Sequence, residues 1–569
     1  MAENMSLREF MEEVERRINS SSKEALCTII MEWARNTDSS SRDDFLLMLA
    51  PPAKKEPSAY GEELLEDICS LLKRVEKGDY SEGWGWDDEI HDEREFGDES
   101  WADEADDFFK DARDAMFAGN YSLAKEAYAL LFEILKMGEE TGHLPGPPDP
   151  LEILETDLEE AVACYLRSLY MASPVGNLPV MIWKTMQKVR HHIKGNLNLN
   201  CLINADTRPL PEFSEFLQAW ITLIRSTNDD SSAYLLCEAT VLSGGTPAIA
   251  ELACREGRRF PRAYIEWIGI LEKQKDYTSM LSAAKQGLLD VPKDYVIRRE
   301  IAGGMIRAAG HLKDRELRLA GWHEAFYSMP SLSDLLSMLS LAEETGCYDE
   351  KISAAIERIE TLRKNEKSDG HEFIENADKI KSTASEILLC QAYLLAGRYR
   401  DALCLCENKK ALGWTYGSNP KALVIPFFLV LLKGNNKRTT PNLEELWNTA
   451  TGISGEYHTL RDADVPQRFK DAMAKVFCSI RLSDDEADKY MHLCITEAGN
   501  RADAIVGEKH RGSYYKAANL LVAAAEVLAS RGRESDGTRL IDKYHQVYNR
   551  HSAFRKELKE AAKRSGMFI

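Results

Sequence analysis

Almost every stretch of this 569-residue chain places apolar residues three and four positions apart. That spacing puts side chains on one face of an α-helix, whereas the alternation typical of a half-buried strand is rare here. Leu64, Ile68 and Leu71 form one such stripe, and Leu540 and Tyr544 belong to another near the end of the chain. The pattern predicts an all-α protein whose amphipathic helices pack against one another.

A chain of this length exceeds the size at which one hydrophobic core keeps growing, so we expect several packing units. Clusters of Pro, Gly and Asn interrupt the helical pattern and predict boundaries between them. We expect an N-terminal helical hairpin (1–50), an acidic and aromatic segment followed by helices (61–175), degenerate helical repeats (176–365) and a C-terminal helical domain (376–569).

The charge balance argues against polyanionic partners. The net charge of -21 and the pI near 5.2 oppose binding to nucleic acid or to an anionic membrane, because such binding depends on Lys and Arg. The longest apolar run, Ala422 to Leu432, is too short to span a bilayer, so we expect it in the core. The N-terminus lacks the layout of a secretory signal. We expect a cytoplasmic protein without a membrane segment.

Twelve cysteines are scattered singly along the chain. Cys27, Cys164, Cys237, Cys390 and Cys478 lie in apolar helical stretches, which predicts buried thiols in a reducing compartment and no disulfide framework.

Three segments share the pattern G-x-Y-x-x-A between two apolar helical stretches. They are Gly119 to Ala124, Gly397 to Ala402 and Gly512 to Ala517. Glycine permits a helix-ending turn at positive φ, the aromatic ring separates the two helices, and alanine lets them cross closely. The pattern predicts three corners between antiparallel helices.

These segments resemble tetratricopeptide (TPR) repeats. The matching residues are Ala112, Gly119, Tyr121, Ala124 and Tyr128 in the first, Gly397, Tyr399, Ala402 and Cys406 in the second, and Gly512, Tyr514, Ala517 and Leu521 in the third. Two degenerate copies carry Lys275 in place of the turn glycine and, after Gly346, Lys351 in place of the alanine. The copies are not spaced evenly at the family's period of about 34 residues. The resemblance therefore implies an irregular TPR-like stack of antiparallel helical hairpins, an α-solenoid, that binds other proteins.

The stretch from Tyr514 to Ala561 is also similar to the helical C-terminal tails of bacterial SWIM zinc-finger proteins. Their Cys-x-Cys and Cys-x-His motif is incomplete, since Cys404-Leu-Cys406 has no later Cys-x-His. This resemblance implies a helical architecture and no zinc.

The segment from Ser81 to Phe109 holds thirteen Asp or Glu residues and one Arg, interleaved with three tryptophans. Exposing each tryptophan costs about 1.5–3 kcal/mol relative to burial, so something must cover them. The segment either packs onto its own scaffold or contacts a basic protein. Binding of Ca²⁺ or Mg²⁺ by the carboxylates is a third alternative, although the EF-hand spacing is not met. For the second alternative, the expected contact residues are Trp84, Trp86, Asp87, Asp88, Glu89 and Trp101.

Searches for reactive motifs in the sequence find none. No C-x-x-C pair, H-E-x-x-H helix, phosphate-binding glycine loop or G-x-S-x-G elbow is present. His191 and His192 lie at a basic helix end, where a structural role is the simpler interpretation. We therefore expect no metal, no cofactor and no catalytic residues.

The sequence thus favours a non-catalytic scaffold or adaptor that binds a partner protein. An alternative is a switch protein in a bacterial signalling or defence pathway, controlled by docking or by cleavage in the loop 433–442. The acidic N-terminal region and the basic C-terminus also suggest head-to-tail self-association.

Overall fold

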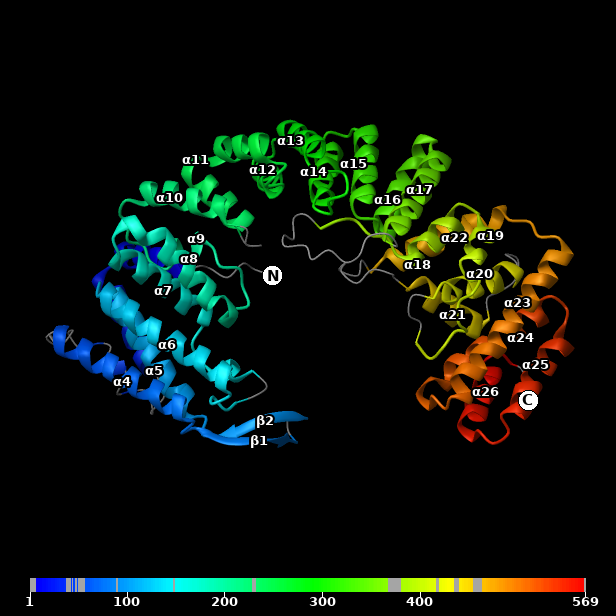
Figure 1. Cartoon of the computed structure of the whole chain (residues 1–569), viewed down its shortest axis with the longest axis horizontal. Helices are drawn as coiled ribbons and strands as arrows, with labels where there is room; N and C mark the ends of the chain where they lie inside the picture. The colour runs from blue at the N-terminus through cyan, green and yellow to red at the C-terminus, as the bar shows by residue number, and fades with distance from the viewer. Residues whose placement is uncertain are drawn as a thin grey trace. The chain divides into compact units, whose positions relative to one another are not determined.

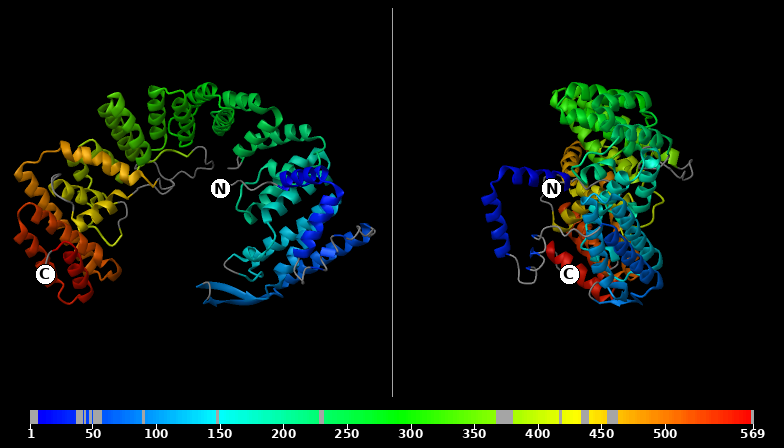
Figure 2. Two further views of the ribbon diagram at one scale, coloured as in Figure 1. Left: turned by 180° about the vertical axis from the view of Figure 1, so that it is seen from behind. Right: turned by 90° about the vertical axis from the view of Figure 1, so that its left-hand side faces the viewer.

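The computed structural model describes residues 7–36, 42, 45–46, 49, 57–88, 91–146, 149–227, 232–366, 380–415, 419–433, 440–453 and 463–566. The chain divides into two compact units, Met1–Ala248 and Ile249–Ile569. Each unit is a stack of helices that pack pairwise against their neighbours in sequence, which confirms the all-α, solenoid-like prediction (Figures 1 and 2). The predicted central part, 176–365, extends across the division between the units.

The first unit begins with two short helices and continues through a hairpin of strands to a stack of helices. Its main elements are α1 (Leu7–Ser20), α2 (Lys23–Asn36), α4 (Pro57–Lys77), β1 (Ser81–Asp87), β2 (Asp92–Gly97), α5 (Ser100–Phe117), α6 (Tyr121–Thr141), α7 (Leu158–Ala172), α8 (Leu178–Val189), α9 (Leu199–Asn204), α10 (Phe213–Ser226) and α11 (Ser232–Glu256).

Aromatic rings hold the middle of the first unit together. Phe132 of α6 stacks on Tyr165 of α7 with ring centroids 5.8 Å apart and meets Phe109 of α5 edge-on at 5.7 Å. All three rings are buried, and offset or edge-to-face aromatic pairs add to the free energy of burial. These contacts fix α5, α6 and α7 as a three-helix core.

The only described sheet is a two-stranded antiparallel hairpin of β1 and β2. It falls within the acidic segment, where the all-α pattern predicts no strand. Glycines between the tryptophans disfavour a helix, and the aromatic residues favour a strand.

Helix α11 is interrupted at Gly245, where φ is 61° and ψ is −151°, just before Pro247. The chain therefore makes two helices here, as the Gly-Gly-Thr-Pro sequence predicts. The division between the two units falls directly after this break.

The second unit starts with three helical pairs and ends in a bundle. Its main elements are α12 (Arg262–Lys273), α13 (Tyr277–Asp290), α14 (Arg298–His311), α15 (Arg315–Ser328), α16 (Leu332–Thr345), α17 (Tyr348–Glu366), α18 (Glu386–Leu395), α19 (Tyr399–Cys404), α20 (Lys421–Lys433), α21 (Pro441–Thr451), α22 (Val465–Ser479), α23 (Asp484–Ala502), α24 (Tyr514–Ser530), α25 (Glu534–Val547) and α26 (Ser552–Arg564). In the bundle, α24 is buried along most of its length and packs against α20, α21, α23, α25 and α26. The apolar run in α20 is core, as predicted.

Eight helix ends in the described part of the chain close with the same turn. In each, one residue adopts a left-handed φ, and the N–H of the next residue donates to the carbonyl five positions earlier, which satisfies a carbonyl left free at the helix end. The left-handed residues are Gly78, Gly119, Lys275, Lys313, Gly346, Gly397, Lys509 and Gly532.

This set confirms the corners at Gly119 and Gly397 and the place of Lys275 in a degenerate copy. It corrects the third corner, because Gly512 lies in a short 3₁₀-helix and the left-handed residue there is Lys509. It also revises the spacing. In the three pairs from α12 to α17, the second helices begin at Tyr277, Arg315 and Tyr348, 38 and then 33 residues apart.

The tyrosine two residues after the turn packs on the following helix. Tyr277 stacks on His311 of α14 with centroids 3.9 Å apart, and the Tyr348 hydroxyl donates to the Leu395 carbonyl of α18 at 3.1 Å. Tyr399 meets Phe428 of α20 edge-on at 6.2 Å. At these corners the aromatic residue contacts the next helix along the chain, whereas the predicted role is to separate the two helices that the turn joins.

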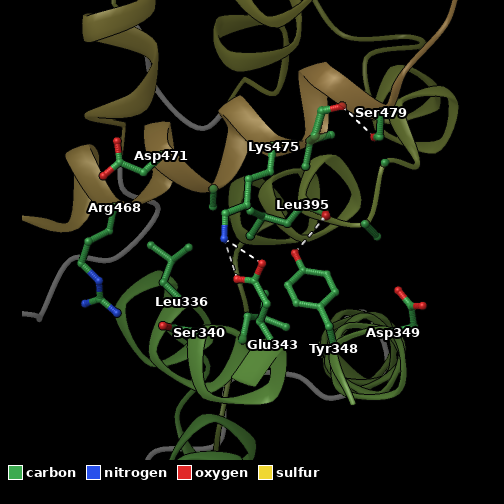
Figure 3. Close-up of a pocket in the computed structure, with 15 residues that line it drawn as sticks. Leu336, Ser340, Glu343, Tyr348, Asp349, Leu395, Arg468, Asp471, Lys475 and Ser479 are labelled. Atoms are coloured by element: carbon green, nitrogen blue, oxygen red, sulfur yellow. Dashed lines mark hydrogen bonds and ion pairs between the residues drawn. The ribbon is translucent and has the colours of Figure 1, made fainter. Parts of the chain in front are cut away.

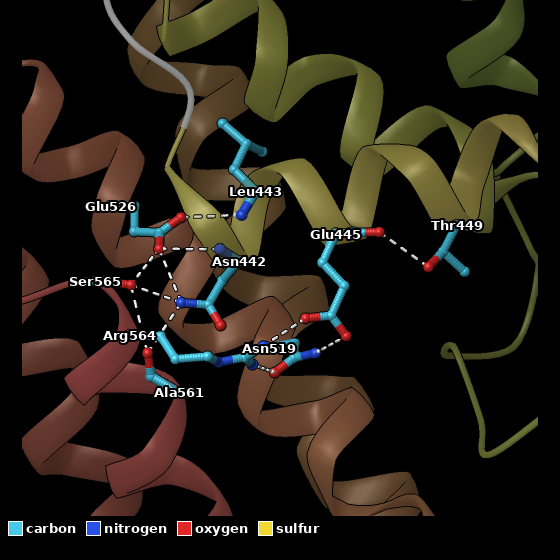
Figure 4. A network of polar contacts seen from close by, with 9 residues as sticks. All are labelled: Asn442, Leu443, Glu445, Thr449, Asn519, Glu526, Ala561, Arg564 and Ser565. Atoms are coloured by element: carbon cyan, nitrogen blue, oxygen red, sulfur yellow. Dashed lines mark hydrogen bonds and ion pairs between the residues drawn. The ribbon is translucent and has the colours of Figure 1, made fainter. Parts of the chain in front are cut away.

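A buried carboxylate fixes the start of α21 (Figure 4). Glu526 of α24 accepts hydrogen bonds from the Leu443 N–H at 3.0 Å, the Asn442 N–H at 3.3 Å and the Asn442 side chain at 2.8 Å. The hydroxyls of Thr440 and Ser565 also donate to it. Because the N-terminus of a helix attracts negative charge, one carboxylate ties together α21, α24 and α26.

Burial of the thiols is uneven. Cys164, Cys237 and Cys390 are buried as predicted, whereas Cys27 and Cys478 are exposed. Cys27 is exposed because α2, the helix that carries it, buries none of its residues. All twelve cysteines are free. None of the helices in the described ranges is both long and apolar enough to cross a bilayer.

The turn at Lys313 offers a test of the corner geometry. Lys313 is exposed with φ 59°, a conformation that costs a side-chain-bearing residue about 1 kcal/mol, so Lys313→Gly should raise the free energy of unfolding by about 0.5–1 kcal/mol in urea titrations. The matched control is Lys285→Gly in the exposed interior of α13, which should lower it by about 1 kcal/mol. Equal losses in both variants would contradict a left-handed turn at position 313.

The buried carboxylate offers a second test. Glu526 is 3% exposed and accepts from five donors, so Glu526→Ala should lower the free energy of unfolding by about 3 kcal/mol or more. Glu445 of the same network is half-exposed and pairs with Arg564, so Glu445→Ala should cost less than about 1 kcal/mol. Similar losses in the two variants would refute the structural role of Glu526.

Candidate functional site: an exposed tryptophan hairpin

The base of the β1–β2 hairpin is anchored in the first unit. The Asp98 N–H donates to the Tyr80 carbonyl at 2.9 Å, and Gly97 lies so close that a Cβ there would be 2.0 Å from that same oxygen. Beyond this base the strands extend past the neighbouring helices (Figure 1). The hairpin is therefore rooted at one end and open to solvent at the other.

One face of the hairpin carries two tryptophans. Trp84 and Trp86 are two residues apart on β1 and share a face, and their side chains are 70% and 59% exposed. Glu93 stands directly opposite Trp86 on β2 and is exposed. This surface, which we call the tryptophan face, combines exposed indole rings with an acidic residue.

The opposite face is internally paired. Arg94 contacts Asp87 at 3.0 Å and Glu99 at 2.8 Å, and its guanidinium lies 5.0 Å from the ring centre of Phe96. Arg94 is also the only Lys or Arg between Ser81 and Gly97. The one positive charge of the hairpin is thus engaged away from the tryptophan face.

The structure separates the six predicted contact residues. Trp84 and Trp86 lie together, Asp88 is exposed beside them in the chain, and Asp87 faces Arg94. Glu89 lies outside the described residues.

Trp101 is fully buried in α5, and its indole N–H donates to the Pro145 carbonyl at 2.9 Å. We therefore remove it from the contact surface. Its carbonyl partner lies far along the chain, but Trp101, Ala105 and Phe109 form an apolar stripe at helical spacing, which is the local signal of its burial.

A pocket of about 570 Å³ lies in the second unit between α16, α17, α18 and α22 (Figure 3). Its wall includes Leu336 and Val476, while Lys475 bonds Glu343 across the opening at 2.6 Å. Burial raises the pKa of Tyr348, another lining residue, to about 12, so this hydroxyl stays protonated at neutral pH. The pocket offers apolar contact with a charged rim and was not found from the sequence, because its four helices come from separate stretches.

One of the two histidines at the basic helix end is buried. His192 is buried beside Glu139, with 3.2 Å between Nδ1 and Oε1, and burial lowers the pKa of its imidazole. Within the described ranges, no three His, Cys, Asp or Glu side chains gather as a metal site would require. Most of the predicted cleavage segment, 434–439 within 433–442, lies outside these ranges.

Comparisons with known proteins add little. No protein-family model matches the chain, and no curated protein matches it. One similar solved structure is described as a circular tandem repeat protein with novel repeat topology and enhanced subunit contact surfaces. It is 13% identical, covers 89% of this chain and 96% of its own, and superimposes with a TM-score of 0.16. So low a score carries no weight, and the fold assignment rests on the helix packing itself.

The difference in exposure among the three tryptophans can be tested by measuring the free energy of unfolding of their alanine variants. Trp84→Ala and Trp86→Ala should change the free energy of unfolding by less than about 0.5 kcal/mol, because both rings are exposed. Trp101→Ala should lower it by about 3–5 kcal/mol, because it removes a fully buried indole. Urea titration of the three variants measures both effects, and an equal loss in all three would contradict the exposure of Trp84 and Trp86.

Proposed function

We propose that this protein is a non-catalytic scaffold or adaptor that binds a basic partner protein in the cytoplasm. The observation that carries the proposal is the tryptophan face, where Trp84 and Trp86 are exposed beside Glu93 on a hairpin rooted in a helical body. Exposed aromatic side chains of this kind are enriched at protein interfaces.

The architecture supports a binding role of the TPR-like type. Helical pairs recur at 38 and 33 residues in the second unit, near the period of about 34 typical of those repeats. Corners at Lys275, Lys313 and Gly346 precede the second helix of each pair. The similarity of the C-terminal bundle to the tails of SWIM proteins remains a proposal about helical architecture alone.

The charge distribution supports a basic partner over nucleic acid. A net charge of -21 repels phosphate polyanions, and the tryptophan face has no Lys or Arg to contact them. An acidic surface attracts a basic protein over a distance of about 8–10 Å at physiological salt, which speeds association.

Affinity purification with mass spectrometry tests the proposal. The double variant Trp84→Ala, Trp86→Ala should lose the partners that the natural protein captures, while its helical content by circular dichroism stays the same. Trp414→Ala is the matched control, because Trp414 is a 50% exposed tryptophan in the other unit. Identical partners with all three proteins would refute the proposed contact surface. Light scattering across a salt series tells a separate partner from self-association.

A further inference from the structure

The hairpin is an incomplete sheet. It has two strands, and no third strand in the described part of the chain pairs with either of them. Isolated two-stranded hairpins are only marginally stable in water, and an open strand edge presents unpaired N–H and C=O groups that another strand can bind. The backbone of β1 thus offers a template for strand addition, a recurring mode of peptide recognition.

The tryptophans determine which edge gains most from an added strand. Trp84 and Trp86 both lie on β1. Side chains directly opposite each other on paired strands lie about 4.5–5.5 Å apart at Cβ. A strand added beside β1 would therefore place every second side chain against the two indole rings.

The charges determine what those side chains are. Glu93 stands opposite Trp86 on the same face, and the only basic residue of the hairpin is held on the opposite face by Asp87 and Glu99. Lys or Arg placed over an indole ring gains a cation–π contact of about 0.5–2 kcal/mol, and tryptophan is the best aromatic partner for it. Acidic side chains would be repelled, and apolar ones would leave the carboxylates without partners.

We propose that an extended segment of the partner, with Lys or Arg at every second position, binds as a third strand along β1 and places its cations over Trp84 and Trp86. This proposal rests on the proposed function and specifies the partner's chemistry. It commits to a segment of another protein and leaves a second copy of this chain as an outcome of the test.

The test is the binding of labelled synthetic peptides to the full-length protein, measured by fluorescence anisotropy. The probe is a short Thr- and Val-rich peptide with Lys at every second position. One control has the same composition with its lysines adjacent, and a second has N-methyl groups on alternate backbone amides. Binding should weaken about fivefold or more with each control, because the first misplaces the cations and the second blocks the strand pairing.

Protein variants separate the contributions. Trp84→Leu and Trp86→Leu retain apolar bulk but lose the cation–π contact, so each should weaken the probe about five- to tenfold. Trp414→Leu should leave the affinity unchanged. Equal binding of the probe and both control peptides would overturn strand addition. In that case the proposed function would still be supported if the alanine double variant loses partner capture. Self-association that Trp84→Leu abolishes would identify a second copy as the occupant and also overturn this inference.

Discussion

The structure depends on how the backbone N–H and C=O groups at the helix ends are hydrogen-bonded. A chain of many short helices leaves N–H groups free at each start and C=O groups free at each end, and these groups must find partners when they are buried. The carboxyl ends are closed by left-handed turns such as those at Gly119, Lys313 and Gly397. Because each turn satisfies its own carbonyl within a few residues, the next helix can start two residues later and pack back on the first. The helical pairs follow from this local geometry.

Many amino ends are capped by their own N-cap side chain, such as Asp276 and Ser331, but two of them use a carboxylate from another helix. Glu526 of α24 holds the start of α21, and Glu238 of α11 accepts from the N–H groups of Leu199 and Asn200 at the start of α9. A carboxylate in this position replaces water as the acceptor and complements the positive end of the helix dipole. Local turns thus make the helical pairs, while distant carboxylates tie selected helices into bundles.

The sequence predicts the helices and several corners well, because both are local. The spacing of apolar residues predicts each helix. The glycines at 119 and 397 predict turns, because glycine is favoured at positive φ. Lys275, Lys313 and Lys509 adopt the same conformation without that signal, so a search based on glycine misses the succession of helical pairs 38 and 33 residues apart in the second unit. The hairpin was missed for another reason. The alternation of Gly and Trp from Gly83 to Trp86 indicates a strand, but the acidic residues that surround it are not typical of strands.

The candidate site shows where local reasoning stops. Trp84 and Trp101 belong to one acidic segment, yet one is 70% exposed and the other is buried against Pro145. Trp101 lies on the apolar stripe of α5 with Ala105 and Phe109, so helical spacing within the segment predicts its burial. The acceptor of its indole N–H lies 44 residues away, and no pattern within the segment encodes that contact. Trp84 and Trp86 lie instead on a two-stranded hairpin, where no such stripe directs them into a core. Pro145 also lies against Gly97 at the base of the hairpin, so the contact that buries Trp101 is next to the point where the strands are anchored.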